Sequence, residues 1–157
     1  MPEVTQKLIE DFSFLISIVV PILLKKSFTL LFGGQIGTGP FFNEIGTTVE
    51  IENEKSSINF WATSGMMAPF YELLRIMTNW LVKRGVKRNN AQRYITSLFL
   101  ALSEDAVVNS KKDLKYLVKE SQTPNGLNEQ SLRELTKSGF YKKLEKALNS
   151  LHKRLDK

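Results

Sequence analysis

One stretch constrains the fold more than any other, because residues 63–84 carry apolar side chains at helical spacing on two faces. A surface helix of a globular protein usually shows one apolar stripe and a wide polar face. Here the polar face is narrow, so this helix requires cover on more than one side. The first stripe is Met67, Phe70, Leu74, Met77 and Leu81, the second is Met66, Leu73, Ile76 and Trp80, and the polar face is Glu72, Arg75, Asn79 and Lys83.

The length of the chain limits where that cover can come from. A chain of 157 residues is enough for one ordinary domain, or for one domain and a fragment. A second copy of the chain is therefore a reasonable source, and we expect a homodimer. The alternative is a monomeric bundle in which this helix is the central one.

The pattern changes along the chain, and we expect one domain in residues 1–52 and another in residues 53–157. The first part alternates short apolar runs with glycines, which predicts strands and turns. The predicted elements are a helix at Pro2–Asp11, strands at Ser17–Val20, Phe28–Phe32 and Thr47–Ile51, a loop at Gly37–Pro40, and a helical turn at Phe41–Ile45 that Gly46 closes.

The second part is predicted to be helical almost throughout. The first helix ends at Gly85, and Thr123 followed by Pro124 is a favourable pair to begin a helix. Asn125-Gly126 is a strong turn signal. The remaining predicted helices are Asn89–Val108 with Tyr94, Ile95, Leu98, Phe99 and Leu102 inward, Lys112–Glu120, Asn128–Gly139, and Phe140–Leu155 with Phe140, Leu144, Ala147, Leu148, Leu151 and Leu155 on one face.

The residue types present exclude several kinds of chemistry. The chain has no cysteine, which removes thiol catalysis and Cys-ligated zinc and is compatible with a reducing cytoplasm. Its only histidine is His152, so one chain cannot build a histidine triad or a multi-histidine metal site. The net charge of +6 gathers at Lys83–Arg88 and from Lys142 onward. A nucleic-acid binder is the alternative to solvated helix faces, and we expect no nucleic acid because no binding motif accompanies the charge.

Two segments of the first part could suggest a nucleotide site or a membrane. Glycines at 33, 34, 37 and 39 invite a phosphate-binding interpretation, but Gly37-Thr38-Gly39 is followed by Pro40 and lacks the third glycine of the dinucleotide fingerprint. The apolar run Phe12–Leu24 is shorter than a membrane-spanning helix, and Pro21 interrupts it. We therefore expect a turn-rich loop and a buried strand, and no membrane partner.

The order of motifs in residues 63–155 resembles the C-terminal dimerisation domain of pyrroline-5-carboxylate reductases. That family has a Ser-Gly-x-Gly-Pro-Ala-Tyr loop that opens a long helix, and here Thr63–Pro69 with Glu72 and Met77 corresponds to it. The family's Thr-Pro-Gly-Gly-Leu-Asn-Glu segment is similar to Thr123–Glu129, and Gly139-Phe140 and Arg154 follow. With Val19-Val20-Pro21 and Phe41–Glu54, the resemblance spans roughly residues 10–155.

The resemblance implies a fold: mainly α, a helical dimerisation domain (6-phosphogluconate dehydrogenase C-terminal-like) preceded by a small α/β remnant of a Rossmann-like domain. It also implies NADP or NAD as the cofactor of the complete family fold. The family begins with a complete Rossmann domain, most of which we expect to be missing here. This chain alone is therefore expected to bind no cofactor and to have no catalytic residue. Three origins of such a chain are compatible with this expectation: a split gene, a frameshifted remnant and an excised segment.

The resemblance also implies substrate-binding residues in two loops that open helices. A pyrroline carboxylate is a small anion, and a helix N-terminus with free N–H groups can bind an anion. Simple helix capping explains the same segments. The family's Thr-Thr pair becomes Leu127 and Asn128, and its Gly-Pro becomes Met66-Met67, which puts the usual substrate in doubt. The candidates are Ser64, Gly65, Met66, Thr123, Pro124, Asn125, Gly126 and Asn128.

Together these observations predict the dimerisation and substrate-side part of a cytoplasmic pyrroline-5-carboxylate reductase-like oxidoreductase of proline biosynthesis. We expect it to be inactive alone, and a separate chain with a Rossmann domain is a second candidate partner beside the second copy. The alternative is a non-catalytic dimeric interaction module or remnant that caps a partner reductase.

Overall fold

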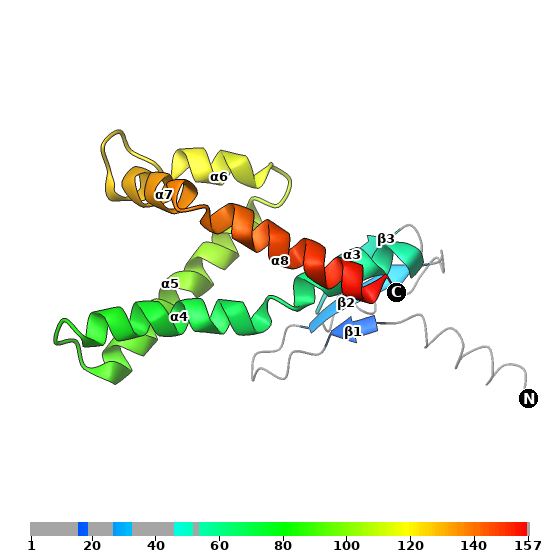
Figure 1. The fold of residues 1–157 in the computed structure, drawn as a ribbon, viewed down its shortest axis with the longest axis horizontal. Helices are drawn as coiled ribbons and strands as arrows, with labels where there is room; N and C mark the ends of the chain where they lie inside the picture. Colours follow the sequence, from blue (N-terminus) through cyan, green and yellow to red (C-terminus); the bar gives the residue numbers. More distant parts are fainter. Residues whose placement is uncertain (1–15, 19–26, 33–45, 52–53, 157) are drawn as a thin grey trace, which may run out of the picture. The chain divides into compact units, whose positions relative to one another are not determined.

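A computed structural model of the chain describes residues 16–18, 27–32, 46–51 and 54–156. The chain divides into two units, residues 1–63 with residues 152–157, and residues 64–151 (Figure 1). The predicted domain boundary between residues 52 and 53 stays a prediction. The predicted helix at Pro2–Asp11, the loop at Gly37–Pro40 and the helical turn at Phe41–Ile45 lie outside the described residues.

The first unit contains a three-stranded sheet in the order β1-β2-β3. Strand β1 (Ile16–Ile18) is antiparallel to β2 (Ser27–Phe32), and β2 is parallel to β3 (Gly46–Ile51). Isoleucine, threonine, valine and phenylalanine dominate these segments and favour extended backbone. The three strands that the sequence predicts are therefore confirmed within the described residues. Gly46, which is predicted to close a helical turn, is instead the first residue of β3 and pairs with Ser27.

A 3-10 turn, η1 (Glu54–Ser56), and a short helix, α3 (Ser57–Ser64), follow β3. Ser57 and Ala62 of α3 are buried. The helix predicted to begin at Thr63 begins instead at Met67, which corrects the expected start. The Thr63 hydroxyl donates to the carbonyl of Phe60 at 2.6 Å, so Thr63 belongs to the last turn of α3.

Five helices make up the second unit, although the last residues of α8 belong to the first one. All the helices predicted for residues 63–155 are present, with ends that differ by a few residues from those expected. Their bounds are α4 (Met67–Val82), α5 (Arg88–Val108), α6 (Leu114–Glu120), α7 (Leu127–Lys137) and α8 (Phe140–Leu155).

Helices α4 and α5 pack against each other and bury a few of their side chains. Thr78 of α4 and Ala91 of α5 are buried, and one turn further along α5 so is Ile95. Phe70 of α4 and Phe99 of α5 add an edge-to-face ring contact with centroids 6.0 Å apart. The two helices form a hairpin in the second unit (Figure 1).

Glycines end two of these helices, as the sequence predicts. Gly85 has φ +90°, and the N–H of Val86 donates back to the carbonyl of Leu81 at 3.2 Å, while that of Gly85 donates to Val82. This hydrogen-bond pair is the Schellman motif that closes a helix C-terminus. Gly139, with φ +76°, occupies the break between α7 and α8.

Burial within α5 is lower than the sequence predicts. Ile95 is inward, and Leu98 and Phe99 are half-buried, but Tyr94 is 61% exposed and Leu102 is 56% exposed. The expected inward positions of Tyr94 and Leu102 are therefore wrong for a single chain. The reason is that α4 covers only one side of α5.

We predict that Gly85→Ala lowers the free energy of unfolding by about 1–2 kcal/mol, because a side chain disfavours a left-handed backbone. No atom lies within 4 Å of an added Cβ, so the whole loss comes from the backbone. Gly85→Asn should lose less, since asparagine tolerates this conformation. Urea denaturation at one fixed protein concentration measures the loss, with exposed Lys83→Ala as the control. An unchanged midpoint for Gly85→Ala would contradict the prediction.

Candidate functional site

The second unit leaves much of its apolar surface uncovered. Ile76 and Trp80 of α4 are both more than half exposed, and Leu100 of α5 is 52% exposed. On α8, Phe140 and Leu144 are about 40% exposed. The described residues of a single chain thus bury only part of the apolar stripes that the sequence presents. This agrees with the prediction that the long helix requires cover on more than one side.

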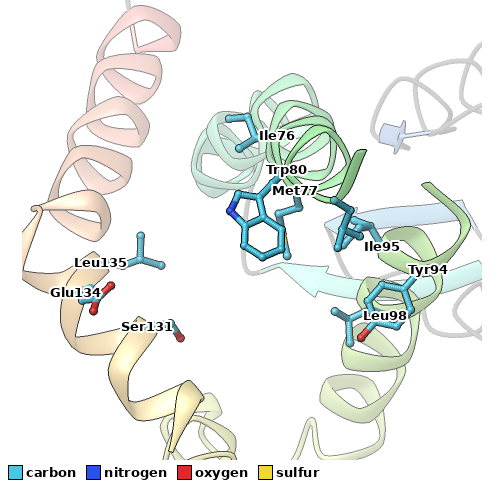
Figure 2. Close-up of a pocket in the computed structure, with 10 residues that line it drawn as sticks. Ile76, Met77, Trp80, Tyr94, Ile95, Leu98, Ser131, Glu134 and Leu135 are labelled. Carbon is cyan, nitrogen blue, oxygen red and sulfur yellow. The ribbon is translucent and has the colours of Figure 1, made fainter. Parts of the chain in front are cut away.

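Part of this surface forms a groove of about 670 Å³ between α4, α5 and α7. Figure 2 shows Trp80 and Leu98 projecting into the space, with Leu135 and Ser131 on the opposite wall. The lining is almost entirely apolar. Its residues are Ile76, Met77, Trp80 and Leu81 from α4, Tyr94, Ile95 and Leu98 from α5, and Ser131, Glu134 and Leu135 from α7.

The polar groups of the groove do not form a catalytic pair. The Glu134 carboxylate accepts a hydrogen bond from Gln130 Nε2 of the same helix at 2.8 Å. Ser131 Oγ donates to the carbonyl of Asn128 at 3.1 Å. A general acid or base has to reach a reacting group, whereas the Glu134 and Ser131 side chains form hydrogen bonds within α7. The groove is therefore suited to receive an apolar surface.

The α7 wall of the groove did not emerge from the sequence reasoning. Ser131 and Leu135 are four residues apart, which places both on one face of a helix. This four-residue spacing is the sequence signal for the α7 wall, but the same spacing is equally common in helices that have no binding surface.

A positively charged side chain stacks on one face of the Trp80 indole. The Arg84 guanidinium lies 3.5 Å from the ring centroid, and Arg84 Nη1 donates to the Trp80 carbonyl at 3.3 Å. A cation over an aromatic face is attracted by the ring quadrupole. Arg84 therefore covers part of an aromatic side chain that also lines the groove.

One ion pair lies on the narrow polar face of α4. Arg75 Nη2 donates to Glu72 Oε1 at 2.6 Å. This hydrogen bond is the main cause that lowers the pKa of Glu72 below its usual value and raises the pKa of Arg75. Both side chains are exposed, so this is a surface pair that contributes little to stability.

The candidate segment Ser64–Met66 consists of the last residue of α3 and the two residues that precede α4. Met66 is the N-cap of α4 and provides no side-chain cap, while its carbonyl accepts from the N–H of Phe70 at 2.9 Å. The first N–H groups of a helix have no partner within the helix. This end of α4 is therefore compatible with the predicted substrate role of Ser64, Gly65 and Met66, which stays a prediction.

The candidate segment Thr123–Asn128 folds as a turn before α7. The N–H of Gly126 donates to the Thr123 carbonyl at 2.8 Å, and Asn125 has φ +60°. Pro124 and Asn125 thus occupy the positions that proline and asparagine favour in a type II turn. Gly126 is the N-cap of α7. Thr123 and Pro124 form this turn and do not supply the cap and first residue of α7, which begins at Leu127, one residue before the predicted Asn128.

Several donors of this turn already have partners in the chain. The N–H of Asn125 donates to Glu129 Oε2 at 2.7 Å, and Asn128 Nδ2 donates to the Ser121 carbonyl at 2.7 Å. The Glu129 carboxylate also lies 3.9 Å from Arg133 Nη1. An anion at this turn would have to compete with a carboxylate that is already in place. The predicted substrate role of Thr123, Pro124, Asn125, Gly126 and Asn128 stays a prediction.

The structure does not bring the two candidate segments together within one chain. Figure 1 shows one at the start of α4 and the other between α6 and α7, away from it. A single site built from both segments would need one of them from a second copy.

The part of the chain that the structure describes gives a nucleotide cofactor little to bind to. A Rossmann site needs a glycine-rich turn between a strand and a full helix whose N-terminus meets the pyrophosphate. Strand β3 is followed by η1 and the eight-residue α3, and residues 52–64 contain no glycine. The glycines at 33–39 lie outside the described residues. The described residues therefore do not fit a dinucleotide.

The described ranges contain neither a cluster of metal-ligating side chains nor a membrane-spanning helix. Within them, no three histidine, aspartate or glutamate side chains gather as they would around a metal ion. No helix in the same ranges is both long and apolar enough to span a membrane.

Comparison with known proteins identifies the helical region. Residues 55–157 match the family described as "Pyrroline-5-carboxylate reductase dimerisation", which is well over half of the chain. The chain belongs to this family. A search of curated protein sequences finds no match to the chain.

Solved pyrroline-5-carboxylate reductases have a similar fold. The enzyme from Coxiella burnetii is 17% identical with a TM-score of 0.68, and the match covers 84% of this chain and 52% of that one. The enzyme from Streptococcus pyogenes is 20% identical with a TM-score of 0.67, and the match covers 83% of this chain and 52% of that one. The Plasmodium falciparum reductase, solved with NADP bound, is 19% identical with a TM-score of 0.65, and the match covers 83% of this chain and 52% of that one. The chain spans about half the length of these relatives, and at this identity the likeness shows the fold.

These findings confirm the predicted kinship and the predicted fold class, a helical dimerisation domain of the pyrroline-5-carboxylate reductase type preceded by a small α/β part.

We predict that Gly126→Ala destabilises the α6–α7 turn, because its Cβ would collide with Thr123 Oγ1 and would lie 2.9 Å from the Thr123 carbonyl oxygen. Overpacking of this kind costs about 1–3 kcal/mol in the free energy of unfolding. In a Thr123→Ala background the same substitution should cost less, since the hydroxyl is gone. Urea denaturation of the four variants tests this, and equal losses in both backgrounds would contradict the assignment.

Proposed function

We propose that this chain is the dimerisation and substrate-side part of a pyrroline-5-carboxylate reductase-like oxidoreductase, and that it acts as a homodimer. The observation that carries the proposal is the uncovered apolar surface of α4 and α5, with the groove between them and α7. Apolar patches of this extent on a soluble protein mark an interaction surface. The family match over residues 55–157 supports a second copy as the partner.

The complete enzyme would reduce a cyclic imine carboxylate with hydride from NADPH or NADH, in proline biosynthesis. A bound nicotinamide would supply the hydride, and the protein mainly positions the imine. In this proposal residues 1–52 are the end of a Rossmann-like domain, and residues 53–157 are the dimerisation domain. Ser64–Met66 and Thr123–Asn128 would bind the substrate anion at helix N-termini. A separate chain with a Rossmann domain is the second proposed partner.

The alternative function is a non-catalytic dimeric module that caps a partner reductase. The contacts of the α6–α7 turn favour it, since Glu129 and Ser121 already accept hydrogen bonds from Asn125 and Asn128. Amide NMR shifts distinguish the two. Addition of pyrroline-5-carboxylate should shift the amides of residues 123–128 if they bind substrate, and should leave them unchanged in a non-catalytic module.

We predict a dimer in solution, with about twice the 17.9 kDa of one chain. Ile76→Asp should weaken it at least about tenfold, because a buried unpaired charge opposes association. Ile76 is 54% exposed in one chain, so the fold of the monomer should survive. Sedimentation equilibrium measures the dissociation constant, circular dichroism checks the helices, and Lys142→Asp is the control. A monomeric wild-type chain at micromolar concentration would contradict the proposal.

A second prediction concerns activity. The purified chain mixed with NADPH and pyrroline-5-carboxylate should show no turnover, because the described residues do not fit a dinucleotide. Loss of NADPH absorbance above the enzyme-free rate would contradict the proposed incompleteness. A full-length reductase assayed in parallel verifies the substrate and the conditions.

A further inference from the structure

The α6–α7 turn contains a pair of residues that its own geometry selects. Asn125 has φ +60°, and asparagine tolerates this left-handed backbone better than most residues that carry a side chain. A Cβ on Gly126 would lie 2.9 Å from the Thr123 carbonyl oxygen, so position 126 disfavours any residue other than glycine. The turn thus favours asparagine followed directly by glycine, a sequence that occurs at no other position of the chain.

An asparagine that precedes glycine is chemically labile. The main-chain nitrogen of the next residue can attack the carbon of the side-chain amide, and glycine has no side chain to hinder that approach. Asparagine is accordingly one of the thermolabile residue types. The reaction changes the chain covalently without an enzyme, and it requires an amide side chain that can rotate towards its own backbone.

The Asn125 side chain can rotate in this way. It is exposed, and no described residue forms a hydrogen bond with its amide. Two other asparagines of the second unit are held in place, because Asn128 Nδ2 donates to the Ser121 carbonyl at 2.7 Å and Asn109 Nδ2 donates to the Asp105 carbonyl at 3.0 Å. Of these three side chains, that of Asn125 is the one available for the reaction.

Two main-chain hydrogen bonds oppose the reaction while the turn is closed. The N–H of Gly126, whose nitrogen is the attacking atom, donates to the Thr123 carbonyl at 2.8 Å. The N–H of Asn125 donates to Glu129 Oε2 at 2.7 Å and fixes the neighbouring backbone. The attacking nitrogen has to lose its proton and its hydrogen-bond partner, so the turn has to open locally before the reaction begins.

We propose that Asn125 is a site of spontaneous deamidation, gated by opening of the α6–α7 turn. The Gly126 nitrogen loses its proton to water and bonds to Asn125 Cγ, while the Cγ–Nδ2 bond breaks and Nδ2 takes up a proton and leaves as ammonia. A succinimide ring results. Water then adds to one of the two ring carbonyls, and the bond between that carbon and the ring nitrogen breaks. The product is aspartate or isoaspartate, and nothing is oxidised or reduced.

Either product changes the turn. An aspartate at position 125 adds a carboxylate near that of Glu129, and like charges disfavour the closed turn. An isoaspartate lengthens the main chain by one carbon, so the hydrogen bond from Gly126 to Thr123 and the cap that Gly126 provides for α7 no longer fit. The inference goes beyond the proposed function and does not depend on it, although the new charge would also repel a substrate anion at this turn.

The first experiment locates the reaction by mass spectrometry. The purified chain is incubated in mildly alkaline buffer and digested with trypsin, which yields the peptide of residues 120–133 with both Asn125 and Asn128. We expect aspartate and isoaspartate at position 125, and little change at Asn128 or at Asn109 and Asn149, which serine follows. Deamidation of Asn125 no faster than that of Asn109 would overturn the assigned site.

The second experiment measures the gate. A synthetic peptide of residues 120–133 is too short to keep the turn and α7 folded in water, so it gives the rate without the gate. The folded chain should react at least about fivefold more slowly, which corresponds to the ~1 kcal/mol that one hydrogen bond contributes. Equal rates, or a faster reaction in the folded chain, would overturn the gating.

Pro124→Ala loosens the turn and leaves the reacting pair intact. Loss of the fixed φ should speed deamidation of the folded chain about two- to fivefold, since a compatible proline stabilises a turn by this much. The same substitution in the synthetic peptide, where the turn is absent, is the matched control and should leave the rate nearly unchanged. Equal acceleration in chain and peptide would contradict the gate.

The effect on the turn is tested with aged protein. Wild-type chain in which mass spectrometry confirms the modification should unfold at a lower urea concentration than fresh chain, at one fixed protein concentration. Asn125→Gly keeps a residue that accepts positive φ but has no amide to lose, so its midpoint should not change with age. Modified wild-type chain with the midpoint of fresh chain would overturn the effect on the turn.

Discussion

A helix with apolar side chains on two faces has to be covered from two directions, and this constraint governs the second unit. Helix α5 covers one face of α4, and Thr78 of α4 and Ala91 of α5 are buried. The other face keeps Ile76 and Trp80 exposed beside the groove. A single chain therefore leaves one apolar surface of the second unit uncovered, beside the groove between α4, α5 and α7. The family match and the fold of the reductases are consistent with an assembly that covers it.

The periodicity of the sequence was sufficient to predict most of the helices. The spacing in 140–155 gives the bounds of α8, and Gly85 and Gly139 mark helix ends because a left-handed backbone favours glycine. Periodicity cannot distinguish a face that packs within the chain from one that packs on another molecule. For this reason Tyr94 and Leu102 were predicted inward, although one chain leaves them exposed.

Local hydrogen bonds explain why neither Thr63 nor the Thr123-Pro124 pair begins a helix. Thr63 bonds backward to Phe60, so α3 ends before α4 begins. The Thr123 carbonyl accepts from the N–H of Gly126, so Thr123 and Pro124 form a turn that precedes α7. Such choices depend on which carbonyl a donor reaches, which residue types alone do not determine. The same limit applies to the candidate site, because motif order located the two loops but not the carboxylate of Glu129 beside Asn125.

The stacking of Arg84 on Trp80 has an optical consequence. The chain has two tryptophans, and Trp80 lies on the wall of the groove while Trp61 lies in α3. An indole that is about half exposed to water and covered on one face by a guanidinium emits differently from one sealed beneath apolar side chains. Replacing Trp61 with phenylalanine would therefore leave a chain whose own fluorescence spectrum follows the covering of this surface without any added label.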